Sequence, residues 1–274
     1  VRLIGDPARR ITHDPVRMLR VIRHAARASF VIDPETWSAL LEHKEKLNLC
    51  PDSRVRDELF KDLRGGACQA WAELALESGI FFVIFPFYRQ ALVDHPEAAA
   101  TRSLLFSLLA VLDRLVEEGK SVPEEVIFSL LLLPLVKVEM ELFSVHTQQA
   151  ASSMCAVLRG KLEGYFSRLN IKRCSQELIA RSLVTLPLMI VNNNGKGWPK
   201  WLTRKSYFGN GLQLFQLYED ACGVKSSAEV IFPEVAVAVE SGRTRPRSSG
   251  SGGGSRGPAF APGTRGGVFG FRKS

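Results

Sequence analysis

The spacing of apolar residues is the feature that most constrains the fold of this chain. Through most of the sequence, apolar side chains recur every three to four residues, clearly so among the leucines of 104–115 and the apolar residues of 212–218. This spacing places them on one side of an α-helix, whereas the strict alternation typical of strands is scarce. The sequence therefore predicts an all-α fold.

Clusters of glycine, proline and asparagine divide the chain into segments of helical length. They occur at 65–66, 119–123, 192–199 and 209–211, where such residues typically interrupt helices. No fixed-period repeat is present, which argues against a regular solenoid. The longest apolar run, 126–138, is shorter than the roughly 20 residues that cross a bilayer and contains Pro134. We therefore expect a buried core helix there, and no membrane partner.

The positive charge of the chain is concentrated at its end. The formal net charge is +8, and residues 241–274 carry seven basic and no acidic side chains, so the preceding residues are close to neutral. From 233 onward the composition shifts to Gly, Ser, Arg and Pro, which predicts a disordered tail. Arginines among glycines and phenylalanines are typical of tails that hold single-stranded nucleic acid, although a solvated tail without a specific role is equally consistent. The predicted RNA-binding residues of this tail are Arg243, Arg245, Arg247, Arg256 and Arg265.

Five scattered cysteines without a CxxC pair indicate neither a disulfide framework nor a zinc site. A reducing, cytoplasmic location fits them best. No signal peptide opens the chain, and its first residue is Val1 rather than methionine. We therefore expect these residues to be a piece of a longer protein.

A helix rich in arginine is predicted near the start. Asp14 followed by Pro15 is a helix start signal, because the carboxylate can cap free N–H groups and proline suits the first helical position. Arg17, Arg20, Arg23 and Arg27 then fall along one side of the helix. The apolar residues Leu19, Ile22 and Ala26 fall on another side.

Two interpretations of these arginines are open. Arginine suits phosphates and base edges because its planar fork donates paired hydrogen bonds. On spacing alone, a solvated, ion-paired helix face is the more common arrangement. Few acidic residues lie nearby in the sequence to pair with so many arginines, which favours a binding surface.

Two ordered motifs, RLIGDP at 2–7 and HDPVRMLR at 13–20, carry a family resemblance. They closely resemble the segment that follows the catalytic head of class II tRNA nucleotidyltransferases and bacterial poly(A) polymerases. The resemblance continues through 30–36, 53–61 and 79–86, and more loosely through 207–215. It implies an all-α arrangement with a nucleotide-recognising and RNA-binding neck at 1–65 and an RNA-binding helical body at 66–232, followed by the tail at 233–274.

The resemblance also implies roles for individual residues. In this family a Glu-Asp-x-x-Arg motif acts as a protein template for the incoming base; Asp14 and Arg17 match its Asp and Arg, and His13 stands in place of its Glu. Arg54 and Glu58 match the helix that supports the template. The arginines implied to line the passage between nucleotide and RNA primer are Arg20, Arg23 and Arg27.

No catalytic residue is predicted in this chain. Nucleotidyl transfer requires two metal ions held by closely spaced carboxylates, and no Asp-x-Asp occurs here. The resemblance places the Mg²⁺ ligands in a preceding head, so we expect this chain alone to be inactive. Its parent would use ATP to add AMP to RNA 3′ ends, with RNA, a nucleoside triphosphate and the RNA-degradation machinery as partners. A CCA-adding enzyme is the close alternative, and a non-catalytic RNA-binding adaptor is the alternative from another class.

Overall fold

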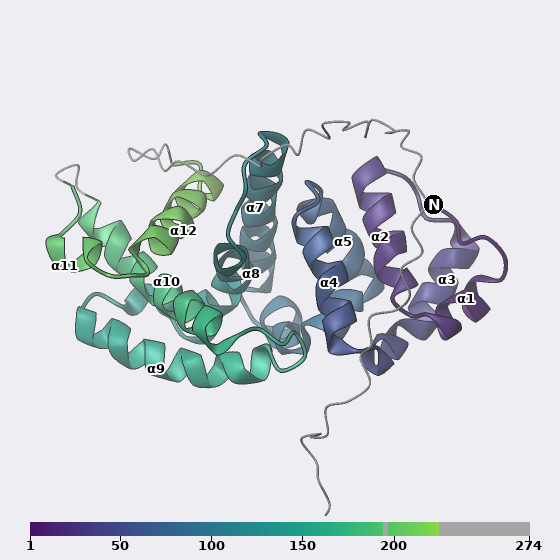
Figure 1. Cartoon of the computed structure of the whole chain (residues 1–274), viewed down its shortest axis with the longest axis horizontal. Coiled ribbons are helices and arrows are strands. Elements are labelled where there is room, and N and C mark those ends of the chain that lie inside the picture. The colour runs from purple at the N-terminus through teal and green to yellow at the C-terminus, as the bar shows by residue number, and fades with distance from the viewer. Residues whose placement is uncertain (194–196, 225–274) are drawn as a thin grey trace, which may run out of the picture. The chain divides into compact units, whose positions relative to one another are not determined.

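The computed structural model describes residues 1–193 and 197–224, and the regular secondary structure in these ranges is helical (Figure 1). The predicted all-α fold is thus confirmed. The α-helices are α1 (Pro7–His13), α2 (Arg17–Ala28), α3 (Pro34–His43), α4 (Asp52–Leu63), α5 (Cys68–Ser78), α6 (Ile80–Ile84), α7 (Ala98–Glu117), α8 (Glu124–Glu139), α9 (Gln148–Tyr165), α10 (Arg173–Asn192), α11 (Lys200–Thr203) and α12 (Phe208–Ala221). Short 3-10 or π-helical turns form η1 (Lys44–Leu49), η2 (Pro86–Tyr88), η3 (Gln90–Asp94) and η4 (Leu142–Ser144).

Two Asp-Pro pairs begin helices in the first part of the chain. Asp6 accepts a hydrogen bond from the backbone N–H of Arg9 at 3.2 Å at the start of α1. Asp33 accepts one from the backbone N–H of Thr36 at 3.1 Å at the start of α3. In both cases the carboxylate satisfies a free donor and the proline occupies the first helical turn. The helices α1 and α3 then pack against each other.

The third Asp-Pro pair behaves differently and corrects the prediction that Asp14 caps a helix. A turn at Pro15 and Val16 precedes α2, which begins at Arg17 and has no side-chain cap. The backbone N–H of Arg17 donates to the Asp14 carbonyl oxygen at 3.1 Å. The Asp14 carboxylate instead contacts two arginine side chains, so it does not satisfy the helix backbone.

The apolar side of α2 is buried, as its spacing predicts. Leu19 and Ile22 are completely buried and Ala26 nearly so. Burial of each large aliphatic side chain contributes about 1.5–3 kcal/mol relative to an exposed position. This helix packs against α5 and also contacts α4, which places the arginines of α2 beside the acidic residues of α4.

A cluster of buried aromatic rings follows the left-handed Gly79 (φ 78°) that joins α5 to α6. The ring centroid of Phe81 lies 5.0 Å from that of Phe85 and 5.5 Å from that of Tyr88. The Tyr88 hydroxyl donates a hydrogen bond to the carbonyl oxygen of Leu131 in α8. These contacts fix the segment after α6 against the central helices.

The predicted core helix is present as α8. All of its residues from Val126 to Val136 are buried, and Pro134 lies inside the helix without ending it. Among the described helices, α10 has the length and composition that could span a membrane, but 61% of that apolar window is buried inside the protein. Burial of this kind is typical of a core helix, and α10 packs on α8, α9 and α12.

The predicted breaks agree with the structure except at the last one. Helices end before and begin after 65–66 and 119–123, and α10 ends at Asn192. The break predicted at 209–211 is wrong, because α12 runs through both glycines. Gly211 lies where α12 approaches α10 closely: a Cβ there would lie 3.6 Å from the Met189 side chain. Both glycines lie in the first turn of α12.

Two further predictions have a different outcome. The tail at 233–274, including its five predicted RNA-binding arginines, lies outside the described residues. The division between neck and body at residue 65 stays a prediction.

All five cysteines are free thiols; Cys50, Cys68 and Cys155 are buried, and Cys174 and Cys222 are exposed.

Candidate nucleic-acid interface

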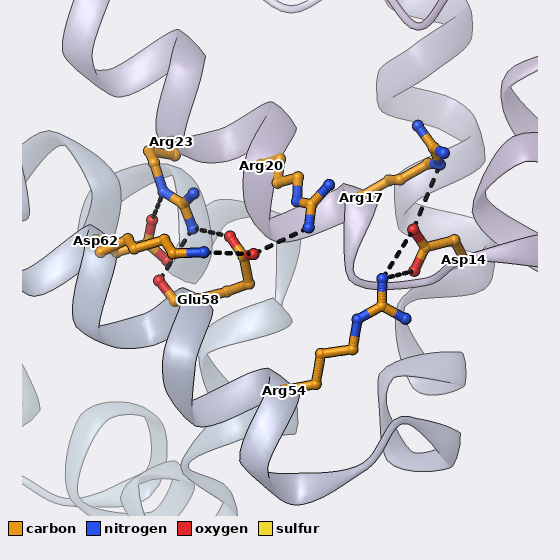
Figure 2. Close-up of polar contacts among 8 residues, drawn as sticks. Asp14, Arg17, Arg20, Arg23, Arg54, Glu58 and Asp62 are labelled. Carbon is orange, nitrogen blue, oxygen red and sulfur yellow. Dashed lines mark hydrogen bonds and ion pairs between the residues drawn. The ribbon is translucent and has the colours of Figure 1, made fainter. Parts of the chain in front are cut away.

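The Asp14 carboxylate is shared by arginines from two helices (Figure 2). Arg17 of α2 places its Nε 3.6 Å from Asp14 Oδ2, and Arg54 of α4 places its Nη2 3.2 Å from Asp14 Oδ1. The carboxylate is only 13% exposed, whereas the Arg17 and Arg54 side chains are 36% and 49% exposed. The predicted template pair is therefore in contact, both arginine side chains are partly exposed, and Arg54 contacts Asp14 directly.

The Glu58 carboxylate lies farther along α4 and binds three cations (Figure 2). Arg20 Nη2 and Lys61 Nζ each lie 3.0 Å from its Oε1, and Arg23 Nη2 lies 2.6 Å from its Oε2. Burial alone would raise the pKa of Glu58, but the hydrogen bonds from Arg23, Lys61 and Arg20 outweigh it and lower the pKa to about 2. Glu58 is therefore ionised at neutral pH and holds α2 against α4.

Arg23 bridges Glu58 to a second carboxylate, Asp62, whose side chain is fully buried. Arg23 Nε donates to Asp62 Oδ1 at 2.5 Å. The other oxygen, Oδ2, is buried without a hydrogen-bond partner among the described residues. Burial raises the pKa of Asp62 to about 7; the neighbouring Glu58 charge adds to this rise, and Arg23 opposes it. Asp62 is therefore protonated more readily than Glu58.

The pairing of Arg23 corrects the picture of one continuous basic face. Few acids lie near the arginines in sequence, but α4 supplies Glu58 and Asp62 from 35 or more residues away. Arg23 is buried between them, whereas Arg20 remains partly exposed. Arg17, Arg20 and Arg23 are thus ion-paired, and the RNA-contacting role predicted for Arg23 stays untested.

A hollow beside Arg17 adds residues that the sequence analysis missed. It has a volume of about 450 Å³ and is lined by Asp6, Arg9, Arg10, His13 and Arg17. The exposed His13 thus lines the same space as Arg17. The Arg9-Arg10 pair was visible in the sequence, but only the packing of α1 beside α2 shows that it shares a space with Arg17.

A second hollow, of about 310 Å³, is lined by Arg23, Arg27, Phe60, Lys61 and Arg64. Arg27 Nη2 donates to the Lys61 carbonyl oxygen at 2.6 Å. Arg64 Cζ lies 4.9 Å from the centroid of the Phe60 ring. We call this hollow the Phe60 hollow. Several cations around one aromatic ring suit the phosphates and bases of RNA.

No group of three or more His, Cys, Asp or Glu side chains suited to a metal ion occurs in residues 1–193 and 197–224. Glu139 and Glu141 are separated by one residue, as paired metal-binding carboxylates often are, but they lie in different local structures. Glu139 accepts hydrogen bonds from Lys161 at 2.9 Å and Tyr165 at 2.6 Å. Glu141 follows the end of α8 in a left-handed conformation.

Comparison with known proteins adds to this geometry. Residues 29–92 match the family model described as the probable RNA and SrmB-binding site of polymerase A. This range includes α3, α4 and α5, and therefore Arg54, Glu58, Asp62 and the Phe60 side of the second hollow.

Individual relatives agree with this match. The chain is 30% identical over 118 residues to poly(A) polymerase I of Haemophilus influenzae, covering 43% of this chain and 26% of that protein. It is 33% identical over 102 residues to poly(A) polymerase I of Escherichia coli, covering 37% of this chain and 22% of that protein. It is 37% identical over 81 residues to the CCA-adding enzyme of Levilactobacillus brevis, covering 30% of this chain and 20% of that protein.

The matches therefore span about a quarter or less of these relatives' lengths. They confirm the predicted resemblance to poly(A) polymerases and CCA-adding enzymes over part of the chain, and they support RNA as a partner of this region.

Proposed function

We propose that this chain is the nucleotide-recognising and RNA-binding part of a poly(A)-polymerase-like enzyme, which adds AMP from ATP to RNA 3′ ends. The observation that carries the proposal is the contact between Asp14 and Arg17, braced by Arg54 from the segment that matches the polymerase family model. The metal-assisted transfer itself belongs to another part of the parent, which would hold Mg²⁺.

The chemistry of the Asp14–Arg17 pair supports base recognition. A carboxylate accepts hydrogen bonds and a guanidinium donates them, so together they present an acceptor beside a donor. Adenine and cytosine both carry an amino group beside a ring nitrogen that accepts, which complements this pair. Guanine and uracil present the opposite order at the corresponding edge. The pair thus suits ATP and CTP and does not separate them.

The cations beyond the pair support RNA binding. Arg20 of α2 is partly exposed and Arg27 is exposed, and the Phe60 hollow adds Lys61 and Arg64. Phosphate contacts of this type release counterions, so RNA affinity should fall with increasing salt.

The deciding experiment uses the intact parent enzyme with Asp14→Ala and Arg17→Ala. We expect both variants to lose selectivity among nucleoside triphosphates by about tenfold or more, with RNA affinity changed less than about twofold. Arg2→Ala is a matched control, because Arg2 is a 64% exposed arginine paired with Glu35 of α3. Equal losses of RNA and nucleotide binding in both variants, or no loss of either, would count against a template role.

The close alternative, a CCA-adding enzyme, is favoured by the match to the L. brevis protein. Incubating the parent with tRNA lacking its terminal CCA separates the two activities. A poly(A) polymerase extends it with ATP alone, whereas a CCA-adding enzyme requires CTP with ATP and stops after three nucleotides.

The alternative from another class is an RNA-binding adaptor without catalysis. It predicts RNA binding without selectivity for any triphosphate, so titration of the parent with each of the four triphosphates tests it. Selective binding of ATP or CTP that depends on Asp14 contradicts the adaptor.

A further inference from the structure

A separate cavity of about 250 Å³ lies among α9, α10, α11 and the residues that follow α11. Its wall includes three cationic side chains, Arg159, Arg181 and Lys205, and two aromatic ones, Trp201 and Tyr207. None of these residues lies in the range matched by the polymerase family model, which ends at 92. None belongs to the site around Asp14 or to the Phe60 hollow.

The two arginines of the cavity are held by one carboxylate. Glu177 Oε2 lies 3.0 Å from Arg159 Nη1, and Glu177 Oε1 lies 2.5 Å from Arg181 Nε. Burial would raise the pKa of Glu177, but the hydrogen bonds from these arginines outweigh it and the pKa is lowered. Glu177 is thus ionised and orients both guanidiniums. Arg159, Arg181 and Lys205 thus place three positive charges around the cavity. Glu177 offsets one of them, so the net charge is positive.

An aromatic surface lies next to these cations. Arg181 Cζ lies 5.5 Å from the centroid of the Tyr207 ring, a cation–π distance. The hydroxyls of Ser152 and Thr185 also line the cavity. Burial raises the pKa of the Cys155 thiol, which is therefore neutral here. The lining thus combines positive charge, hydroxyl groups and partly buried aromatic rings, without a lining carboxylate.

From these contacts we infer that the cavity binds one nucleotide of single-stranded RNA, its phosphate against Arg159 and Lys205 and its base against Tyr207. The inference rests on the proposed function in that the chain binds RNA. The volume lies just below the range of about 300–1,000 Å³ typical of small-molecule sites, which suits a single nucleotide unit. Aromatic stacking beside cations is the usual way in which single strands are held without sequence preference.

The test measures binding of a fluorescent oligoadenylate of about twelve nucleotides to the full chain by anisotropy over a range of salt concentrations. The double variant Arg159→Gln with Lys205→Gln removes two exposed cations and leaves the Arg181–Glu177 pair in place. We expect affinity to fall about fivefold or more. The slope of log affinity against log salt should flatten by about 0.7, the contribution of one phosphate contact on a single strand.

The matched control is Arg173→Gln, which removes an 89% exposed arginine at the start of α10 that pairs with Glu163 at 3.6 Å. Its affinity and salt slope should stay unchanged. A second pair of variants tests stacking: Tyr207→Ala should weaken binding about fivefold or more, and Tyr207→Phe should restore it because the ring is kept.

Each contrary result has a definite meaning. An unchanged affinity and slope in the double variant overturns the inference, as does an equal loss in Arg173→Gln. Competition by ATP or inorganic phosphate as strong as that by unlabelled oligoadenylate overturns RNA as the ligand and indicates a free phosphate compound. If cavity variants bind normally while variants of Arg27 and Lys61 do not, the cavity inference fails and the proposed function stands. If the unaltered chain does not bind the oligonucleotide, both fail.

Discussion

The interface between α2 and α4 contains two arginine–carboxylate clusters that differ mainly in burial. At one end, Asp14 meets Arg17 and Arg54, both of which are at least a third exposed. At the other end, Arg23 lies between Glu58 and Asp62, and all three side chains are at least nine-tenths buried. The same pairing chemistry therefore occurs in two different environments.

This difference separates a structural cluster from an accessible one. Removing one partner from a buried ion pair leaves an uncompensated charge and is strongly destabilising, whereas exposed pairs contribute little to stability. The Arg23 cluster fixes α2 on α4. The Asp14 cluster, held in place by that packing, keeps donors accessible to a ligand.

The largest effect is expected from Arg23→Ala. It leaves Glu58 and Asp62 buried without their main partner, so the free energy of unfolding should fall by about 3–5 kcal/mol. Arg17→Ala, in the accessible cluster, should lower it by no more than about 1 kcal/mol. Urea denaturation of both variants measures the contrast. Equal losses would remove the distinction between the clusters.

A smaller effect is expected from Glu58→Gln, of about 2 kcal/mol at neutral pH, because a hydrogen bond to a charged group is lost while Asp62 remains beside Arg23. The pKa of Glu58 is lowered to about 2. Its stabilisation is therefore fully present above its unfolded pKa of 4.5 and is lost as pH falls towards 2. Unfolding measured from pH 6 to pH 2 should show the stability advantage over Glu58→Gln disappearing. An advantage that is constant with pH contradicts the proposed pairing.

The Asp62→Asn substitution should show the opposite pH dependence. Because the pKa of Asp62 is raised to about 7 from 3.8, its contribution is present below pH 3.8 and is lost as pH rises through about 7. The unaltered chain should thus lose stability relative to Asp62→Asn between pH 4 and pH 8. Thermal unfolding at intervals across this range measures the trend. A gain in relative stability over the same range would show that Arg23 holds Asp62 ionised.

The smallest effect concerns the exposed end of α2. Arg27→Gln should leave the free energy of unfolding within about 0.5 kcal/mol of the unaltered chain, as for most surface substitutions. The salt slope of RNA affinity should flatten by about 0.7, the contribution of one phosphate contact on a single strand. Anisotropy titrations at several salt concentrations test this. An unchanged slope would exclude Arg27 from the RNA contacts.

Several features were accessible from the sequence because they depend on local patterns. Helical spacing predicted the all-α fold, and the apolar run at 126–138 predicted the buried helix α8. The resemblance to poly(A) polymerases agrees with the matched relatives, and the matched family model includes Arg54. The pairing of Arg23 was missed because its partners lie on α4, and proximity in sequence does not report contacts between helices. The helix through Gly209 and Gly211 was missed because packing of α12 on α10, α7 and α8 stabilises it against the low helix propensity of glycine.

The three Asp-Pro pairs separate what the sequence determines from what the tertiary structure decides. The sequence alone determined that the chain is helical and that an aspartate followed by proline, as at Asp14, is suited to a helix start, since backbone capping is a local property. Only the tertiary structure decided that Asp6 and Asp33 cap helices while Asp14 does not. The physical reason is competition: α4 brings Arg54 to Asp14, and two guanidiniums attract its carboxylate more strongly than neutral backbone N–H groups do.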